Sequence, residues 1–216
     1  MEPLIVEAVL TGRAEPLRGD ELSAIAKTAE DGPVDIGVLG LVGDEQADLR
    51  VHGGPDKAIH HYPRDHYAFW ESQSFMHPKL EQAGAFGENI STSGLTESAA
   101  CIGDRYRLGT ALVEISQGRQ PCWKQGHVMD WPELVALMVK HRRAGWYYRV
   151  IEPGRLTAGD SLTLLDRPHP EWTVERVFAL LIGGEGKADR ASVETITGLD
   201  VLAREWRAKA EKIAAR

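Results

Sequence analysis

Short apolar runs, each followed by glycine or proline turns, fill the chain as far as Arg167 and constrain its fold more than any other feature. Runs of this length bounded by turn residues are typical of β-strands, and many of them in succession indicate a barrel or a sandwich. The sequence therefore predicts a mainly β, barrel-like fold with a few helices. The clearest runs are residues 4–10, 34–36, 102–108, 111–116, 146–151 and 161–165.

Helical patterns interrupt this series at two places. Pro63 stands where a helix over residues 63–72 would begin, and Asp130 can serve as the N-cap of a helix over residues 130–142. Residues 24–27 read as one more short strand, and the glycine-rich residues 38–50 as an ordered loop.

The pattern changes at Arg167-Pro168-His169-Pro170, after which apolar residues recur at helical spacing over residues 173–181, 191–196 and 199–214. We therefore expect a main domain over residues 1–167 and a three-helix domain over residues 168–216. This tail contains eight acidic and eight basic residues. Its neutrality favours a packing or dimerisation role over DNA recognition.

Charge and composition exclude several classes of protein. The net charge of −7 over 216 residues argues against broad nucleic-acid binding, which needs a basic surface. No apolar stretch is long enough to cross a bilayer, and the first residues lack the basic and apolar regions of a signal peptide. Two cysteines, Cys101 and Cys122, make no disulfide framework. We therefore expect a cytoplasmic protein with free thiols.

Cys122 is the residue with the clearest chemical context. It follows the predicted strand 111–116 on a glycine- and proline-containing turn, with Arg119 and Lys124 on either side. Nearby cations stabilise a thiolate, the form that acts as a nucleophile or a metal ligand. The alternative is a free cysteine packed as a small hydrophobic residue.

A glycine-rich segment precedes the first predicted helix. Gly53 and Gly54 would allow close backbone approach to an anion, with His52 and Lys57 adding polar or cationic contacts. The alternative is a tight turn with a solvated lysine. The segment has neither the P-loop spacing nor a Gly-x-Gly-x-x-Gly after a strand, so a nucleotide fold is not expected.

Further polar residues each admit two interpretations. Glu88 and Asn89 could bind the edge of a heteroaromatic ligand or stabilise their own turn. Lys27 could contact a phosphate or face solvent, and Ser23 alone is uninformative. His60 and His61 should point to opposite sides of a strand. With His52 and His66 they lack a zinc spacing, so hydrogen-bonding roles are expected.

Together these segments resemble the MOSC family, named for the C-terminal domain of molybdenum cofactor sulfurase, and among its members the YiiM type. The matching segments span most of residues 1–167 in family order, and the tail resembles the three-helix domain that follows MOSC in YiiM-type proteins. They are residues 23–27, 40–44, 52–56, 62–63, 86–89, 103–104 and 119–122.

The resemblance implies a barrel-like fold and, at Cys122, a thiolate that coordinates molybdenum or holds sulfur. In YiiM-type members the metal belongs to a pterin, the molybdenum cofactor (molybdopterin), and the activity is reduction of N-hydroxylated compounds such as hydroxylaminopurines. Asp44 and His52 would handle protons. The residues predicted to contact the cofactor are Ser23, Lys27, Gly53, Gly54, Glu88, Asn89, Arg119 and Lys124.

The expected partners follow from this chemistry. A small N-hydroxylated substrate would be reduced by electrons from an external electron-transfer protein, because two cysteines cannot hold a typical four-cysteine cluster. The tail could pair with a second copy of the chain. Two other functions stay open: a carrier with a persulfide on Cys122, and a non-catalytic binding module acting through the tail.

Overall fold

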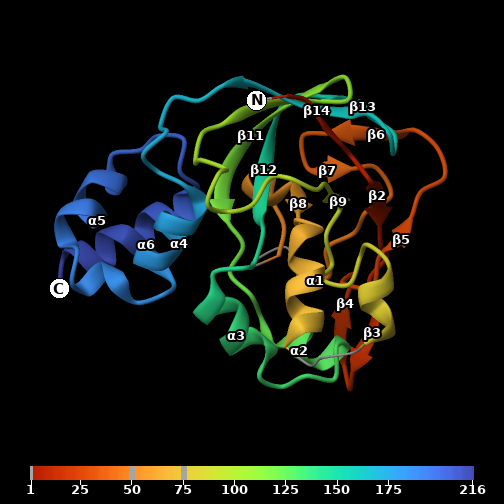
Figure 1. Ribbon diagram of the computed structural model, residues 1–216, viewed down its shortest axis with the longest axis horizontal. Coiled ribbons are helices and arrows are strands. Elements are labelled where there is room, and N and C mark those ends of the chain that lie inside the picture. Colours follow the sequence, from red (N-terminus) through yellow and green to blue (C-terminus); the bar gives the residue numbers. More distant parts are fainter. Residues whose placement is uncertain (1, 49–51, 74–76) are drawn as a thin grey trace.

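A computed structural model describes residues 2–48, 52–73 and 77–216. These residues form a curled, mixed nine-stranded sheet in which all neighbouring pairs are antiparallel except β8 and β9. Figure 1 shows the sheet wrapping around the upper part of the molecule. Its order is β1 (Leu4–Ile5), β14 (Ser161–Asp166), β10 (Arg105–Leu108), β11 (Ala111–Gly118), β12 (Trp146–Glu152), β8 (Ile59–His61), β9 (Ile90–Ser91), β2 (Ala8–Thr11) and β5 (Thr28–Ala29).

Two smaller sheets complete the β structure. One is three-stranded, in the order β13 (Gly154–Leu156), β6 (Val34–Gly37) and β7 (Gly40–Leu41). The other is a hairpin of β3 (Glu15–Arg18) and β4 (Glu21–Ser23). The hairpin lies beside α2 at the lower edge of Figure 1, and this puts β4 near the segment that follows Cys122.

The helices divide into two groups (Figure 1). Within the main body are α1 (Asp65–Ser72), α2 (Trp123–Val128) and α3 (Leu134–His141), with the short 3-10 helices η1 (Pro55–Lys57) and η2 (Pro78–Glu81). The tail forms α4 (Val174–Leu181), η3 (Glu185–Lys187), α5 (Arg190–Thr197) and α6 (Arg204–Ala214), packed against one side of the sheet.

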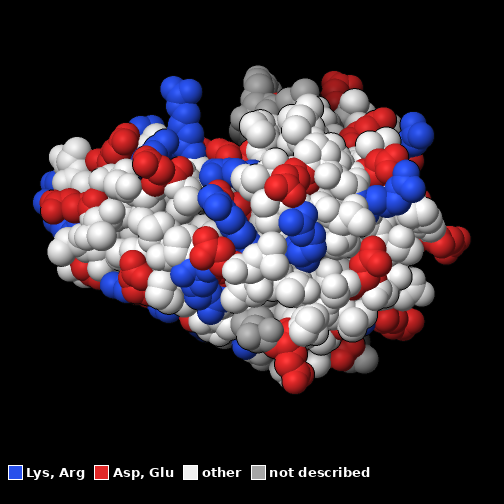
Figure 2. Space-filling view, turned by 90° about the horizontal axis from the view of Figure 1, so that it is seen from above, with Lys and Arg blue, Asp and Glu red and all other residues white. Residues whose placement is uncertain are grey.

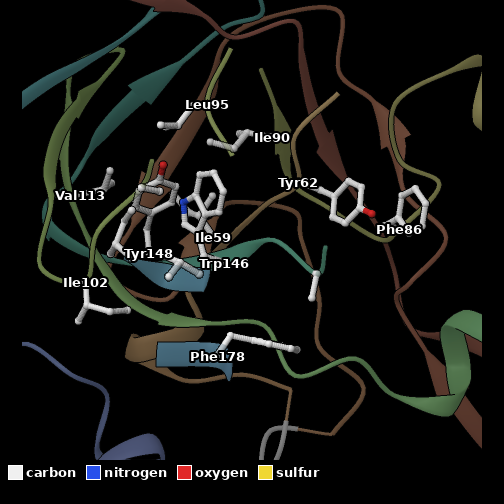
Figure 3. Packing of buried hydrophobic residues seen from close by; sticks show 14 of the residues in the cluster. Ile59, Tyr62, Phe86, Ile90, Leu95, Ile102, Val113, Trp146, Tyr148 and Phe178 are labelled. Carbon is white, nitrogen blue, oxygen red and sulfur yellow. The ribbon is translucent and has the colours of Figure 1, made fainter. Parts of the chain in front are cut away.

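The core lies inside the curl of the sheet. Figure 3 shows Trp146 and Tyr148 of β12 beside Ile59 and Val113 from the flanking strands, and all four are fully buried. Because successive side chains of a strand point to opposite faces, Tyr147 between them projects away from this core. The same alternation puts His61 in the core, where its ring nitrogens contact Tyr148 and Thr92.

The tail shares this core. Trp206 of α6 is fully buried and stands against the backbone at Gly118, where a Cβ would come within 2.8 Å of its ring. The backbone N–H of Ala203 donates to the carbonyl of Ser116 at 2.9 Å. Apolar packing therefore continues from β11 into the helices, and the domain boundary at residue 167 stays a prediction.

Most of the predicted architecture is confirmed. The curled sheet, the helix after Pro63, the β10–β11 hairpin and the three tail helices all form. Thr173 is the N-cap of α4, because its side chain accepts a hydrogen bond from the N–H of Arg176. Residues 4–10 form two strands, β1 and β2, rather than one. The predicted loop over residues 38–50 contains the short strand β7, and its residues 49–50 lie outside the described residues.

Two local predictions were wrong. Residues 24–27 are not a strand, because this segment crosses the chain at Gly12, where a Cβ would come within 2.6 Å of the Ala26 carbonyl. Asp130 is not an N-cap. It has a left-handed φ of 47° in the turn before α3, which begins at Leu134. Helix α2 was not expected at all.

No helix in the described part of the chain is both long enough and apolar enough to cross a membrane.

Candidate functional site

A cleft opens where the loop after β4, the segment after β7 and the ends of β8, β11 and β12 meet. It collects residues that are far apart in the sequence, including most of those predicted to bind a cofactor or handle protons. Eight predicted residues line it: Ser23, Lys27, Asp44, His52, Asn89, Arg119, Cys122 and Lys124.

Cys122 is the N-cap residue of α2, and its half-buried thiol faces the cleft. Burial pushes the pKa of this thiol upward. The hydrogen bond with His52, the charge of Arg119 and the N–H of Lys124 act in the opposite direction and together lower its pKa to about 7. A substantial fraction of Cys122 is therefore thiolate at neutral pH.

Lys124 stabilises that thiolate through its backbone rather than its side chain. Its Nζ donates to the carbonyl of Leu22 at 2.7 Å and lies 3.5 Å from the Glu21 carboxylate. The ammonium group is thus bound to β4, while the N–H of the same residue faces the sulfur of Cys122. The sequence predicts that the positive charge of Lys124 acts on the thiol of Cys122. In the structure the backbone N–H of Lys124 does so instead.

Arg119 has no ion-pair partner among the described residues. Its residue is 6% exposed, and its backbone N–H donates to the carbonyl of Gly145 at 2.9 Å. Its Nη1 is buried and has no hydrogen-bond partner among the described residues. A buried charged donor left unpaired is costly. The guanidinium is therefore suited to an anionic group in the cleft.

Asp44 and Lys27 form a buried ion pair in the cleft wall, with side chains 3% and 6% exposed. Oδ1 of Asp44 accepts from Lys27 and from the N–H of Gly12, and Oδ2 accepts from Asn89. Burial lowers the pKa of Lys27, although the charge of Asp44 opposes this. In this structure Asp44 orients Lys27, and its role in proton transfer stays a prediction.

Three predicted residues lie outside the lining of the cleft. Glu88 is fully buried and accepts hydrogen bonds from Tyr67 and from the backbone of its own turn. Gly53 and Gly54 line a neighbouring groove against α6. The structure therefore separates Glu88 from Asn89, and the roles of these three residues toward a cofactor stay predictions.

His60 and Tyr147 also line the cleft, although neither was predicted to be a site residue. Nδ1 of His60 contacts the Gly87 carbonyl at 3.2 Å, and a carbonyl can only accept, so this nitrogen carries the proton. Burial, together with the charge of Arg119, holds the pKa of His60 well below its usual value. Strand alternation could have indicated that His60 and Tyr147 face the cleft, because their neighbours His61 and Tyr148 face the core.

The described residues contain no group of three or more His, Cys, Asp or Glu side chains able to hold a metal ion by themselves. Among the described residues that line the cleft, Cys122 is the one thiol, and it lies with the basic side chains of Lys27 and Arg119. This donor set suits a metal that arrives with most of its own ligands, rather than one bound by the protein alone.

Comparisons with known proteins agree with this architecture. Residues 48–163 match the model of the MOSC domain. The chain belongs to the MOSC domain family. It is 45% identical over 159 residues to the protein YiiM of Escherichia coli, with 74% of this chain and 71% of YiiM aligned. A protein of Gibberella moniliformis named "Reductase" is 39% identical over 179 residues, and the match covers 82% of this chain but only 32% of that longer protein.

Solved structures extend this family relationship over the tail. The crystal structure of YiiM from Geobacillus stearothermophilus superimposes with a TM-score of 0.83 at 30% identity, covering 98% of this chain and all of that one (100%). The structure of YiiM from Escherichia coli gives 0.81 at 32% identity, covering 100% of this chain and 94% of that one. The YiiM-type resemblance predicted from the sequence is confirmed.

Proposed function

We propose that this MOSC protein binds the molybdenum cofactor in the cleft and reduces N-hydroxylated compounds, with Cys122 as the metal ligand. Membership of the MOSC family and similarity to a reductase-named protein support a cofactor-associated oxidoreductase in general terms. The metal, the substrate class and a cytoplasmic location are part of the proposal.

One observation supports the proposal most directly. The thiol of Cys122, with a pKa of about 7, faces the same cleft as Arg119, whose Nη1 has no hydrogen-bond partner in the described part of the chain. A thiolate is the protein ligand preferred by thiophilic metals, and a guanidinium matches phosphate oxygens. The cofactor carries both a thiophilic metal and a phosphate, so the residues present are compatible with it.

The reaction requires two electrons and two protons. A hydroxylamine group, R–NHOH, is converted into R–NH2 and one water as its N–O bond breaks. When bound, the cofactor supplies the redox chemistry of this step. The protein supplies position and charge: Arg119 and Lys27 bind anionic groups, and Asp44 and Asn89 hold Lys27 in place.

His52 is the residue best placed to influence protonation at Sγ of Cys122. It lines the cleft and forms a hydrogen bond with that thiol, which favours the thiolate. When the site is loaded, keeping Sγ deprotonated keeps it available as a ligand. His60, which also lines the cleft, is neutral, so it adds no charge to the pocket.

The test compares metal and pterin content with activity. Wild-type protein from a host that makes the cofactor should contain molybdenum and release an oxidised-pterin fluorescence signal in equal amounts. Cys122→Ala should lose the metal and the reductase activity. Cys101→Ala is the matched control, because Cys101 is a buried thiol outside the cleft. Full metal content and full activity in Cys122→Ala would overturn the proposal.

The same thiol also supports a second function, a persulfide carrier. A thiol with a pKa near neutrality, half-buried at a cleft, is suited to accept and pass on sulfur. Cyanide-labile sulfur on Cys122 in protein that contains no molybdenum would favour the carrier. Stoichiometric molybdenum without labile sulfur would favour the reductase.

A further inference from the structure

A second basic surface lies on the helical tail, outside the cleft. It is a groove between the C-terminal end of α4 and helix α6. Leu180 and Ile213 contribute apolar surface, and Lys187, Lys209 and Lys212 line it with positive charge. No acidic side chain lines this groove within the described residues. We refer to it below as the tail groove.

Folding separates charges that the sequence of the tail balances. Lys209, Lys212 and Arg216 recur at a spacing of three and four residues, so they share one face of α6 and its C-terminal end. Two acidic residues near the groove pair outside it: Glu205 with Lys57 and Glu185 with Arg142. The tail is neutral overall, yet this groove is lined by basic side chains and, among the described residues, by no acidic one.

The tail groove extends toward the cleft through Lys209. Its Nζ donates to Oε1 of Gln120 at 2.7 Å, and Gln120 is two residues before Cys122. Burial lowers the pKa of Lys209. The negative charge of Glu205 opposes this shift, while the positive charges of Lys57 and Lys212 act in the same direction as burial. The tail groove therefore directly contacts the loop that carries Cys122, through Lys209 and Gln120.

We propose that the tail groove is the docking surface for an acidic electron-carrying protein that supplies the reductase. This inference rests on the proposed function, which requires an external source of two electrons. A positive surface with apolar contacts matches a protein partner that has acidic side chains around an exposed cofactor.

Nucleic acid fits this surface less well. Binding to a phosphate backbone depends on an extended array of cations. The tail groove is instead short and partly apolar, and the chain carries a net charge of −7. Figure 2 shows a face of the molecule on which acidic and basic side chains are interspersed.

The chemistry also favours a transient interface. A one-electron carrier must dock, be oxidised and leave twice for each N–O bond that is reduced. Charged residues around an interface accelerate encounter without requiring tight binding. Lysines with exposed side chains, such as Lys187 and Lys212, fit that purpose better than a large apolar surface would.

The test uses two defined acidic carriers, a bacterial flavodoxin and a [2Fe–2S] ferredoxin, with the full-length protein. Binding is measured by titration calorimetry at low salt, which needs no reductase activity. The wild type should bind at least one carrier, and the double variant K187E/K212E should bind at least about tenfold more weakly. The control K79E/K140E makes the same charge change outside the tail groove and should bind like the wild type.

A kinetic measurement separates docking from chemistry. With the reduced carrier as donor, K187E/K212E should lose at least about tenfold in turnover, and added salt should slow the wild type much more than the variant. With dithionite-reduced methyl viologen, which bypasses docking, all variants should match the wild type. Inactivity of the wild type with methyl viologen would refute the proposed function, while the binding result would still stand.

Three results would overturn the docking proposal. One is failure of the wild type to bind either carrier, and another is an equal loss of binding in K79E/K140E. The third is binding of a DNA or RNA oligonucleotide at physiological salt that K187E/K212E abolishes. K187A/K212A, checked by thermal unfolding, should show an intermediate loss of carrier binding. It thereby separates the loss of positive charge from any misfolding caused by the added glutamates.

Discussion

Nδ2 of Asn89 donates a hydrogen bond of 2.8 Å to Oδ2 of Asp44. The turn before β9 therefore holds the carboxylate that binds Lys27 in the wall of the cleft. The amide of Asn89 is fully used, since its Oδ1 also accepts from the N–H of His60 at 2.9 Å. Asn89 thus connects two elements of the site, β8 and the segment after β7. By orienting Asp44, it also keeps the counter-ion of Lys27 in place.

Removing Asp44 should destabilise the fold as well as the site. Asp44→Ala leaves Lys27 buried without its counter-ion, and breaking a buried pair from one side typically costs about 3–5 kcal/mol. Urea denaturation should show this loss in the free energy of unfolding. Glu45→Gln, at the next residue, changes a pair that is largely exposed and should stay within about 0.5 kcal/mol of the wild type. Similar values for both variants would contradict this role of Asp44.

The reactivity of Cys122 should follow its pKa of about 7. In a Cys101→Ser background, alkylation by iodoacetamide should be about tenfold faster at pH 8 than at pH 6, because the thiolate is the reactive form and is lost as the pH falls through this pKa. The ordinary thiol pKa is higher, so an unperturbed cysteine would still be mostly protonated at pH 7.

The side chains of His52 and Arg119 should control the pKa of Cys122, measured as the midpoint of the pH dependence of its alkylation. His52→Ala removes the hydrogen bond that favours the thiolate, and Arg119→Gln removes the nearby positive charge. Each change should therefore raise the pKa of Cys122 and slow its alkylation at pH 7. Lys124→Met should have little effect, because the N–H that faces the sulfur is retained. A midpoint unchanged by His52→Ala would show that the thiolate is stabilised in another way.

Much of the site was predictable because local signals and family motifs agreed. The strand–turn context of Cys122 identified the reactive residue, and alternation along β8 predicted the separation of His60 from His61. In contrast, the sequence gives no indication that Lys27 pairs with Asp44, because tertiary packing alone brings together residues separated by 17 positions.

The sequence does not show which of two adjacent polar residues faces the site. Glu88 and Asn89 were assigned together, yet one binds its own turn and the other lines the cleft. Lys124 was predicted as a cation near sulfur, but its ammonium group binds Leu22. Both outcomes depend on side-chain direction, which the sequence does not specify. In the tail, likewise, the equal numbers of acidic and basic residues in the sequence do not show that basic side chains gather in the tail groove.

Gly145 should be intolerant of a side chain. It has a φ of 75°, and a Cβ there would come within 2.2 Å of the His61 carbonyl. Gly159 also has a positive φ, of 96°, but no heavy atom lies within 4 Å of the corresponding Cβ position. Gly159→Ala should therefore show backbone strain alone, about 1–2 kcal/mol. Gly145→Ala should lower the stability measured by thermal unfolding clearly more than Gly159→Ala does. It should also displace Arg119, because the carbonyl of Gly145 accepts the backbone N–H of Arg119. Equal losses would argue against the steric contact.

Trp206 should determine how tightly the tail packs against the sheet. It is fully buried, and its ring contacts the backbone at Gly118 in β11. Trp206→Ala would leave a large cavity and should lower the free energy of unfolding by about 3–5 kcal/mol. The indole Nε1 has no hydrogen-bond partner among the described residues, so Trp206→Phe loses no hydrogen bond and should cost less. If denaturation of Trp206→Ala by urea affected only the tail, with the sheet retaining its wild-type stability, the tail would be an independent unit. A single, weakened transition would show that sheet and tail unfold together.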